Sequence, residues 1–497
     1  MVMCAASLVT TLLWMNTPNL LYLPLVFILV LFAAAKENAL LYLLTAVVDT
    51  AIFAARTGLS DAGFAYIKSI AMLICALIIA FLGLIIFVDN DMTELMTGFV
   101  LSRTKSRRGY YVSLSAVTLL GSFSPEFGAA LGAGLFSECG RKIGVSREKT
   151  AFLSNAVAVF AQAVILIFSC APILGALRAG LDAAGGADVA EYAFFKTTIQ
   201  FFYFPLSLLV IILMEIIKLR DFGPLYTAEK NARQSFSTKR AKELSETYAG
   251  NKVFVLKFVP VFLCIAAFLL GIVLNMERSA AALAASAVFL ASAVIKQTLF
   301  EKKSFAALIS VQSLRDKLPA KQLLVSAFSA LIMITAMFGD YSGIAAGVVS
   351  ENIHLYLLAI VSGVIGFAVS FITGNPVIAI AAVLPASIPT TWFASGEVIY
   401  YTMAVGCVVS GAYAGYMCSP VSPVTVSAAV FSSCDIQSHS RNMLVYALFT
   451  FGCTLVFGYL PISIGFTTAF GLLITLFGTH ALFETLSRSV DRKIIKL

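Results

Sequence analysis

One segment of the sequence combines helix-breaking residues with oxygen-bearing side chains inside a strongly apolar stretch. Residues 410–427 read SGAYAGYMCSPVSPVTVS, with two Ser-Pro pairs and two glycines. Inside a membrane, backbone that leaves the helix persists only where protein or a water-filled cavity satisfies its peptide groups. Broken helices of this kind hold ions and substrates in transporters. We therefore expect a binding site in this segment.

Two further apolar segments are interrupted in the same way, LLGSFSPEFGAALGAG at 119–134 and FITGNPVIAI at 371–380. Glycine and proline weaken a helix at these places. A single break could merely kink or pack a helix, but three polar breaks favour a site. Helix ends that meet at such breaks suit a small ion or a charged substrate group. The oxygen-bearing candidates are Ser124, Thr373, Asn375, Ser419, Ser422 and Thr425.

Two carboxylates lie within apolar segments, where charged groups are costly and usually functional. Glu126 lies at the 119–134 break, and we expect a proton and a cation to compete for it. Asp49, in LLTAVVDTAIFAA, is the second candidate. A structural carboxylate that is hydrogen-bonded inside the helix bundle is the alternative for Asp49.

The composition predicts an all-α integral membrane protein. Hydrophobic residues make up 60% of the 497 residues and charged residues 12%, and the mean hydropathy is +0.94. A spanning helix needs about 20 mostly apolar residues, which predicts about 11 to 13 membrane elements in one polytopic domain. We expect two inverted repeats with broken helices or re-entrant hairpins, at about 20–217 and 253–487, joined by a cytoplasmic linker at 218–252.

The net charge of +8 comes from basic clusters between the apolar segments. The positive-inside rule gives these clusters a topological role, so we expect no nucleic-acid partner. We place all five clusters and the C-terminus in the cytoplasm, and the protein in the plasma membrane, the inner membrane of a bacterium. The bilayer is the expected surrounding, and the oligomeric state is left open, a homodimer included. The clusters are 103–108, 141–149, 218–257, 296–321 and 488–496.

The motifs of common enzymes are missing from the sequence. It contains no GxxxxGK[ST], no GxSxG and no HExxH, and its three histidines stand apart. We therefore expect no enzyme and no cofactor, with Na+ or H+ as the coupling ion of a secondary transporter for an ion or small molecule.

Several segments resemble the NhaC-type Na+/H+ antiporters. Residues 410–427 are similar to that family's SGAYFGDKLSPLSDTTNLA, and 145–158, VSREKTAFLSNAVA, to its SREKLAYLVDSTAA. FITGNP resembles ATGTSW, and residues 220–224 with Glu229 resemble the central loop. His439 matches a family histidine, in what we expect to be a loop.

This resemblance implies an ion-transporter fold and Na+/H+ exchange by alternating access. It also places Asn155, Tyr416 and Pro423 where the family has aspartates, so Asn155 joins the candidate binding residues and only Glu126 keeps a charge. A proton- or Na+-coupled carrier of an organic acid or amino acid is therefore the alternative.

Overall fold

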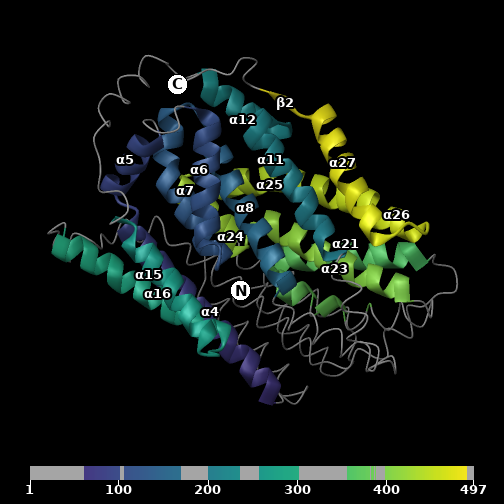
Figure 1. Cartoon of the computed structure of the whole chain (residues 1–497), viewed down its shortest axis with the longest axis horizontal. Coiled ribbons are helices and arrows are strands. Elements are labelled where there is room, and N and C mark those ends of the chain that lie inside the picture. The colour runs from purple at the N-terminus through teal and green to yellow at the C-terminus, as the bar shows by residue number, and fades with distance from the viewer. Residues whose placement is uncertain are drawn as a thin grey trace, which may run out of the picture. The chain divides into compact units, whose positions relative to one another are not determined.

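The described part of the chain is almost wholly helical (Figure 1). Five of its helices are long and apolar enough to cross a bilayer, or six if the bent pair Cys75–Phe87 and Asp91–Phe99 counts as one span. This confirms the all-α class, whereas the count of 11 to 13 elements stays a prediction. The computed structural model describes residues 61–100, 106–168, 200–234, 257–300, 355–380, 382–384, 387 and 398–489.

The chain divides into two compact units whose segments alternate along the sequence. The first unit comprises 1–74, 171–197 and 320–416, and the second comprises 75–170, 198–319 and 417–497. The two inverted repeats and their linker stay a prediction.

The second unit holds most of the described helices. Its α7 lies among α5, α6, α8 and α24, and α11 packs against α27. The bounds are α5 Asn90–Phe99, α6 Arg107–Gly121, α7 Pro125–Lys142, α8 Arg147–Phe168, α11 Tyr203–Lys218, α12 Gly223–Gln234, α15 Val259–Val273, α16 Arg278–Ile295, α24 Pro423–Ser432, α25 Ile436–Cys453, α26 Leu460–Ser463 and α27 Thr468–Leu486. Between or beside them lie η3 Gln200–Phe202, η4 Lys296–Phe300 and η5 Thr454–Tyr459.

The break predicted at 119–134 is much shorter than that segment. α6 ends at Gly121 and α7 begins at Pro125, so only three residues separate the helices. Gly128 and Gly132 lie inside α7, where we expected them to weaken the helix. A Cβ atom on Gly128 would lie 2.6 Å from the carbonyl oxygen of Thr118. These glycines therefore serve the close approach of α6 and α7.

The break predicted at 410–427 is shorter as well. α23 (Val398–Cys418) continues through both glycines, and α24 begins at Pro423. Only residues 419–422 leave the helix. The third break follows α21 (Leu355–Thr373), where Gly374 has a φ of +65°. Asn375 then accepts a 2.9 Å hydrogen bond from the Val377 N–H, and the helix resumes.

In the first unit, glycines bring α21 and α23 into backbone contact. A Cβ atom on Gly363 would lie 2.8 Å from the carbonyl oxygen of Cys407. Cβ atoms on Gly411 and Gly415 would overlap the carbonyl oxygens of Gly363 and Phe367. Small residues spaced in this way are a common basis of helix association in membranes.

A two-residue antiparallel ribbon joins the segment after α11 to the segment after α27. Arg220 of β1 (Arg220–Asp221) pairs with Ser489 of β2 (Arg488–Ser489). The Arg220 guanidinium donates to the carbonyl oxygens of Glu484 and Ser487 at 2.9 and 2.7 Å. These are orphan acceptors at the end of α27, so Arg220 caps that helix.

We predict that Gly411→Ala destabilises the protein, because the new methyl group meets backbone that cannot move aside. Overpacking of this kind costs about 1–3 kcal/mol. Gly452→Ala on α25 is the matched control, since a Cβ there meets nothing within 4 Å. Thermal unfolding in detergent should show a lower Tm for Gly411→Ala alone, and equal Tm values would contradict the close contact of α21 and α23.

Candidate ion-binding site

The break between α23 and α24 is buried, and side chains of other helices satisfy its peptide groups. The last carbonyl of α23, at Cys418, accepts a 2.7 Å hydrogen bond from Ser440 of α25. The carbonyl before it, at Met417, accepts from the Thr425 hydroxyl at 3.1 Å and from the Asn155 amide at 3.2 Å. Contributions from α8, α24 and α25 therefore fix the end of α23.

Asn155 is the centre of this arrangement. It is fully buried in the middle of α8, and its amide nitrogen lies 3.1 Å from the Thr425 hydroxyl oxygen and 3.2 Å from Nε2 of His439. We call the side chains of Asn155, Thr425 and His439, together with the Met417 carbonyl, the Asn155 cluster. All four groups belong to the second unit.

Three buried polar atoms at this place have no hydrogen-bond partner among the described residues. They are Oδ1 of Asn155, Nδ1 of His439 and the hydroxyl oxygen of Ser422. Ser422 is the N-cap of α24, but its side chain makes no capping bond. A buried polar atom without a partner costs about 1–3 kcal/mol. Amide and hydroxyl oxygens of this kind are ligands for a hard cation.

His439 lies in a helix, which corrects the loop expected from the sequence. Asp435 caps α25 by accepting a 2.8 Å hydrogen bond from the Ser438 N–H, so the helix starts at Ile436. His439 then falls in its first turn and is fully buried. The Asp435 cap, three residues before Ser438, is the sequence signal that could have revealed this helix start.

Ser124 and Glu126 lie together at the start of α7. The Ser124 hydroxyl donates a 2.8 Å hydrogen bond to the Glu126 carboxylate, and both residues are half-buried. The helix dipole favours a negative charge at this position. α7 also packs against α24, the helix that follows the other break.

The remaining predicted residues are placed as follows. Ser419 is buried in the break, and its hydroxyl oxygen accepts from the Val421 N–H at 3.3 Å. Thr373 and Asn375 flank the break after α21 in the first unit, where the Thr373 hydroxyl donates to the Val369 carbonyl at 2.8 Å. Their convergence with the Asn155 cluster stays a prediction. Asp49 lies outside the described residues.

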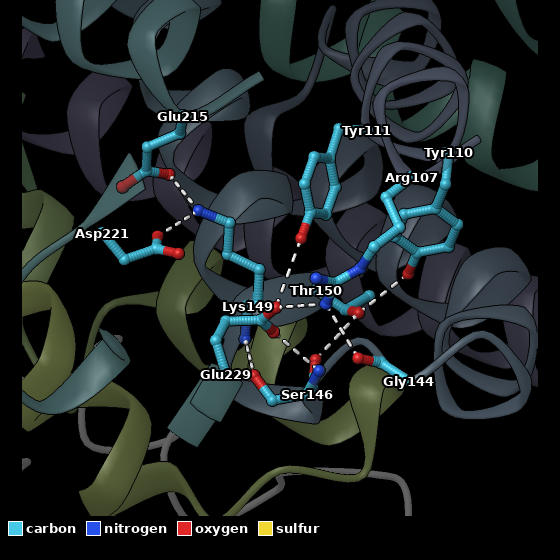
Figure 2. Close-up of polar contacts among 10 residues, drawn as sticks. All are labelled: Arg107, Tyr110, Tyr111, Gly144, Ser146, Lys149, Thr150, Glu215, Asp221 and Glu229. Atoms are coloured by element: carbon cyan, nitrogen blue, oxygen red, sulfur yellow. Dashed lines mark hydrogen bonds and ion pairs between the residues drawn. The ribbon is translucent and has the colours of Figure 1, made fainter. Parts of the chain in front are cut away.

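A second buried polar region lies at the start of α6 and α8 (Figure 2). Arg107 pairs with Glu229 at 2.6 Å, and it also donates to the Gly144 carbonyl at 2.8 Å. The other Glu229 oxygen accepts a 2.7 Å hydrogen bond from the Ser146 N–H. Glu229 thereby ties α12 to both α6 and the start of α8.

Lys149 completes this buried charge network. Its ammonium pairs with Glu215 of α11 at 2.7 Å and with Asp221 of β1 at 2.5 Å. The network, which comprises Arg107, Lys149, Glu215, Asp221 and Glu229, holds two cations and three carboxylates, all buried. Burial raises the pKa of Glu229 above its ordinary value, and the Arg107 guanidinium opposes this shift.

The network corrects the purely topological role that the sequence assigned to the basic clusters. Arg107 and Lys149 belong to two of those clusters, yet both are buried and ion-paired. Glu215 was missed altogether. Its signal was present, because a carboxylate in the apolar segment SLLVIILMEIIK is unusual.

The comparison with known families covers the region that contains the Asn155 cluster. Residues 151–463 match the family model described as the Na+/H+ antiporter family. The chain belongs to the Na+/H+ antiporter family. This confirms the resemblance read from the motifs, and it identifies a transporter family rather than an enzyme class. No individual curated protein matches the sequence.

We predict that Glu229→Ala lowers the free energy of unfolding by about 3–5 kcal/mol, because it leaves the buried Arg107 guanidinium and the Ser146 N–H without their acceptor. Glu138→Ala is the matched control. Its pair with Arg141 is exposed, at 33% and 60%, and should contribute less than about 1 kcal/mol. Comparable Tm losses in the two variants would contradict a structural role of the network.

The same variant should change how stability depends on pH. Because folding raises the pKa of Glu229, the folded state binds its proton more tightly than the unfolded state. The stability that Glu229 contributes is therefore present at low pH and is lost as the pH rises from about 4.3 through the raised pKa. Tm measured against pH should fall less steeply in Glu229→Ala than in the unaltered protein. Parallel curves would contradict the shift.

Proposed function

We propose that the protein is a secondary transporter that exchanges Na+ for H+ across the plasma membrane by alternating access. The observation that carries this proposal is the family match over 151–463, which contains every residue of the Asn155 cluster. The apolar helices supply the membrane domain, and the buried break supplies oxygen ligands away from lipid. We place the C-terminus in the cytoplasm, on the side of the basic clusters.

The cation would bind at the break between α23 and α24. The unpartnered Asn155 oxygen and the Thr425 hydroxyl are neutral oxygen ligands there, and the Met417 carbonyl, which accepts a hydrogen bond from each of these two side chains, holds them in place. We assign four further binding residues to this unit. They are Ser419 and Ser422 of the same break, and Ser124 and Glu126 at the start of α7. Thr373 and Asn375 are the candidate binding residues of the first unit.

The first test is transport by purified protein in liposomes. With an acidic lumen, addition of external Na+ should make the lumen more alkaline, as reported by an enclosed pH dye. Protein-free liposomes give the background. If Na+ has no effect while a carboxylate is taken up with protons, the chain carries an organic acid instead, and the proposal fails.

The second test removes one hydroxyl of the cluster. Thr425→Val deletes the donor to the Met417 carbonyl, and we expect the apparent affinity for Na+ to fall about 5- to 100-fold, the equivalent of about 1–3 kcal/mol. Thr450→Val is the matched control, because the Thr450 hydroxyl is buried as well but, among the described residues, bonds only to the carbonyl of Tyr446 on its own helix. Equal affinities in the two variants would remove Thr425 from the site.

A further inference from the structure

The ends of α11 and α27 meet at an exposed charged surface. The two helices pack together, and the Lys218 ammonium at the end of α11 lies 2.9 Å from the Glu484 carboxylate and 3.5 Å from Nε2 of His480 on α27. Both helices belong to apolar segments long enough to cross a membrane, Gln200–Lys218 and Thr468–Leu486. Charged side chains at the end of such a segment lie at the level of the lipid headgroups.

Positive charge is in excess on this surface, which we call the α11–α27 surface. It carries three cations and one carboxylate, so two positive charges remain when the histidine is counted as neutral. The negative ends of the two helix dipoles, about half a charge each, reduce this excess without cancelling it. The surface comprises Lys218, Arg220, His480, Glu484 and Arg488, all partly or fully exposed.

Exposed apolar side chains continue from this surface along both helices. On α27, Leu473 and Phe477 are 53% and 67% exposed, and the spacing of four and then three residues puts His480 on the same face. On α11, Ile217 is 54% exposed and directly precedes Lys218. A positive end next to an apolar strip matches a phospholipid, whose anionic headgroup lies above its acyl chains.

Two features favour a lipid over a soluble acidic partner at the α11–α27 surface. The apolar strip lies within the membrane segments, where acyl chains reach it and a soluble partner does not. The surface also lies on the side that we assign to the cytoplasm, and anionic lipids give that leaflet its negative potential. An ammonium has three N–H donors, so Lys218 can bind a phosphate oxygen and keep its contact with Glu484.

We propose that the α11–α27 surface binds an anionic phospholipid, with the phosphate at Lys218 and His480 and an acyl chain along Ile217 and Phe477. Glu484 holds the Lys218 ammonium in place, but its negative charge opposes the phosphate. The two members of this ion pair therefore have opposite effects on lipid affinity. This inference goes beyond the proposed ion exchange and does not depend on which ion is transported.

The first test compares lipids that are added to the purified protein in detergent. Phosphatidylglycerol should raise Tm in a saturable way, because a ligand stabilises the state that binds it, whereas phosphatidylcholine with the same acyl chains should not. An equal shift with phosphatidylcholine would overturn the proposal. An equal shift with glycerol phosphate would reduce the surface to a simple anion site, and an equal shift with polyglutamate would indicate a protein partner. Each of these results also overturns the proposal.

The second test uses the opposite effects of the two paired charges, with the Kd for phosphatidylglycerol measured by native mass spectrometry. Lys218→Gln should raise this Kd about fivefold, whereas Glu484→Gln should lower it. Arg141→Gln is the matched control, because Arg141 also forms an exposed ion pair, with Glu138, but on α7, which lies among other helices.

If the Lys218–Glu484 pair only stabilises the fold, both variants should change the Kd in the same direction. That result would overturn the proposal. A rise of the Kd in Arg141→Gln as large as in Lys218→Gln would overturn it as well, because the lipid would then respond to net charge alone.

Discussion

The break between α23 and α24 imposes the constraint on which the rest of this structure depends. Peptide groups that leave a helix inside an apolar core must find partners within the protein. Here the carbonyls of Met417 and Cys418 receive hydrogen bonds from Asn155, Thr425 and Ser440. These three side chains come from different helices, so the break holds only while α8, α24 and α25 keep their packing. The groups that satisfy the backbone are also the groups that could bind an ion.

Two other features of the second unit keep these helices in place. Gly128 allows α7 to approach α6 closely, and α7 in turn packs against α24. At the start of α8, Lys149 is held between Glu215 and Asp221, which fixes the helix that carries Asn155. An uncompensated charge buried there would be costly. The charge network thus positions the Asn155 cluster, although none of the network's own residues belongs to that cluster.

The sequence predicted the helical class, the three breaks and the candidate Thr425, because Gly, Pro and polar residues in an apolar segment are strong local signals. Asn155 became a candidate only through the family resemblance. It misjudged the lengths of the breaks. Gly411 and Gly415 were expected to interrupt α23, but their lack of a side chain serves helix packing instead. Local composition cannot distinguish these two uses, since the difference depends on which helix lies opposite. For the same reason the burial of Arg107, Lys149 and His439 was not foreseen.

Calorimetry of Na+ binding to the purified protein, in two buffers that differ in their heat of ionisation, would show whether a cation displaces a proton at the Asn155 cluster. We predict that about one proton is released for each Na+ bound near the titration midpoint of the site, and that Asn155→Ala abolishes both the binding and the proton release. Na+ binding without proton release, or binding that survives unchanged in Asn155→Ala, would contradict it.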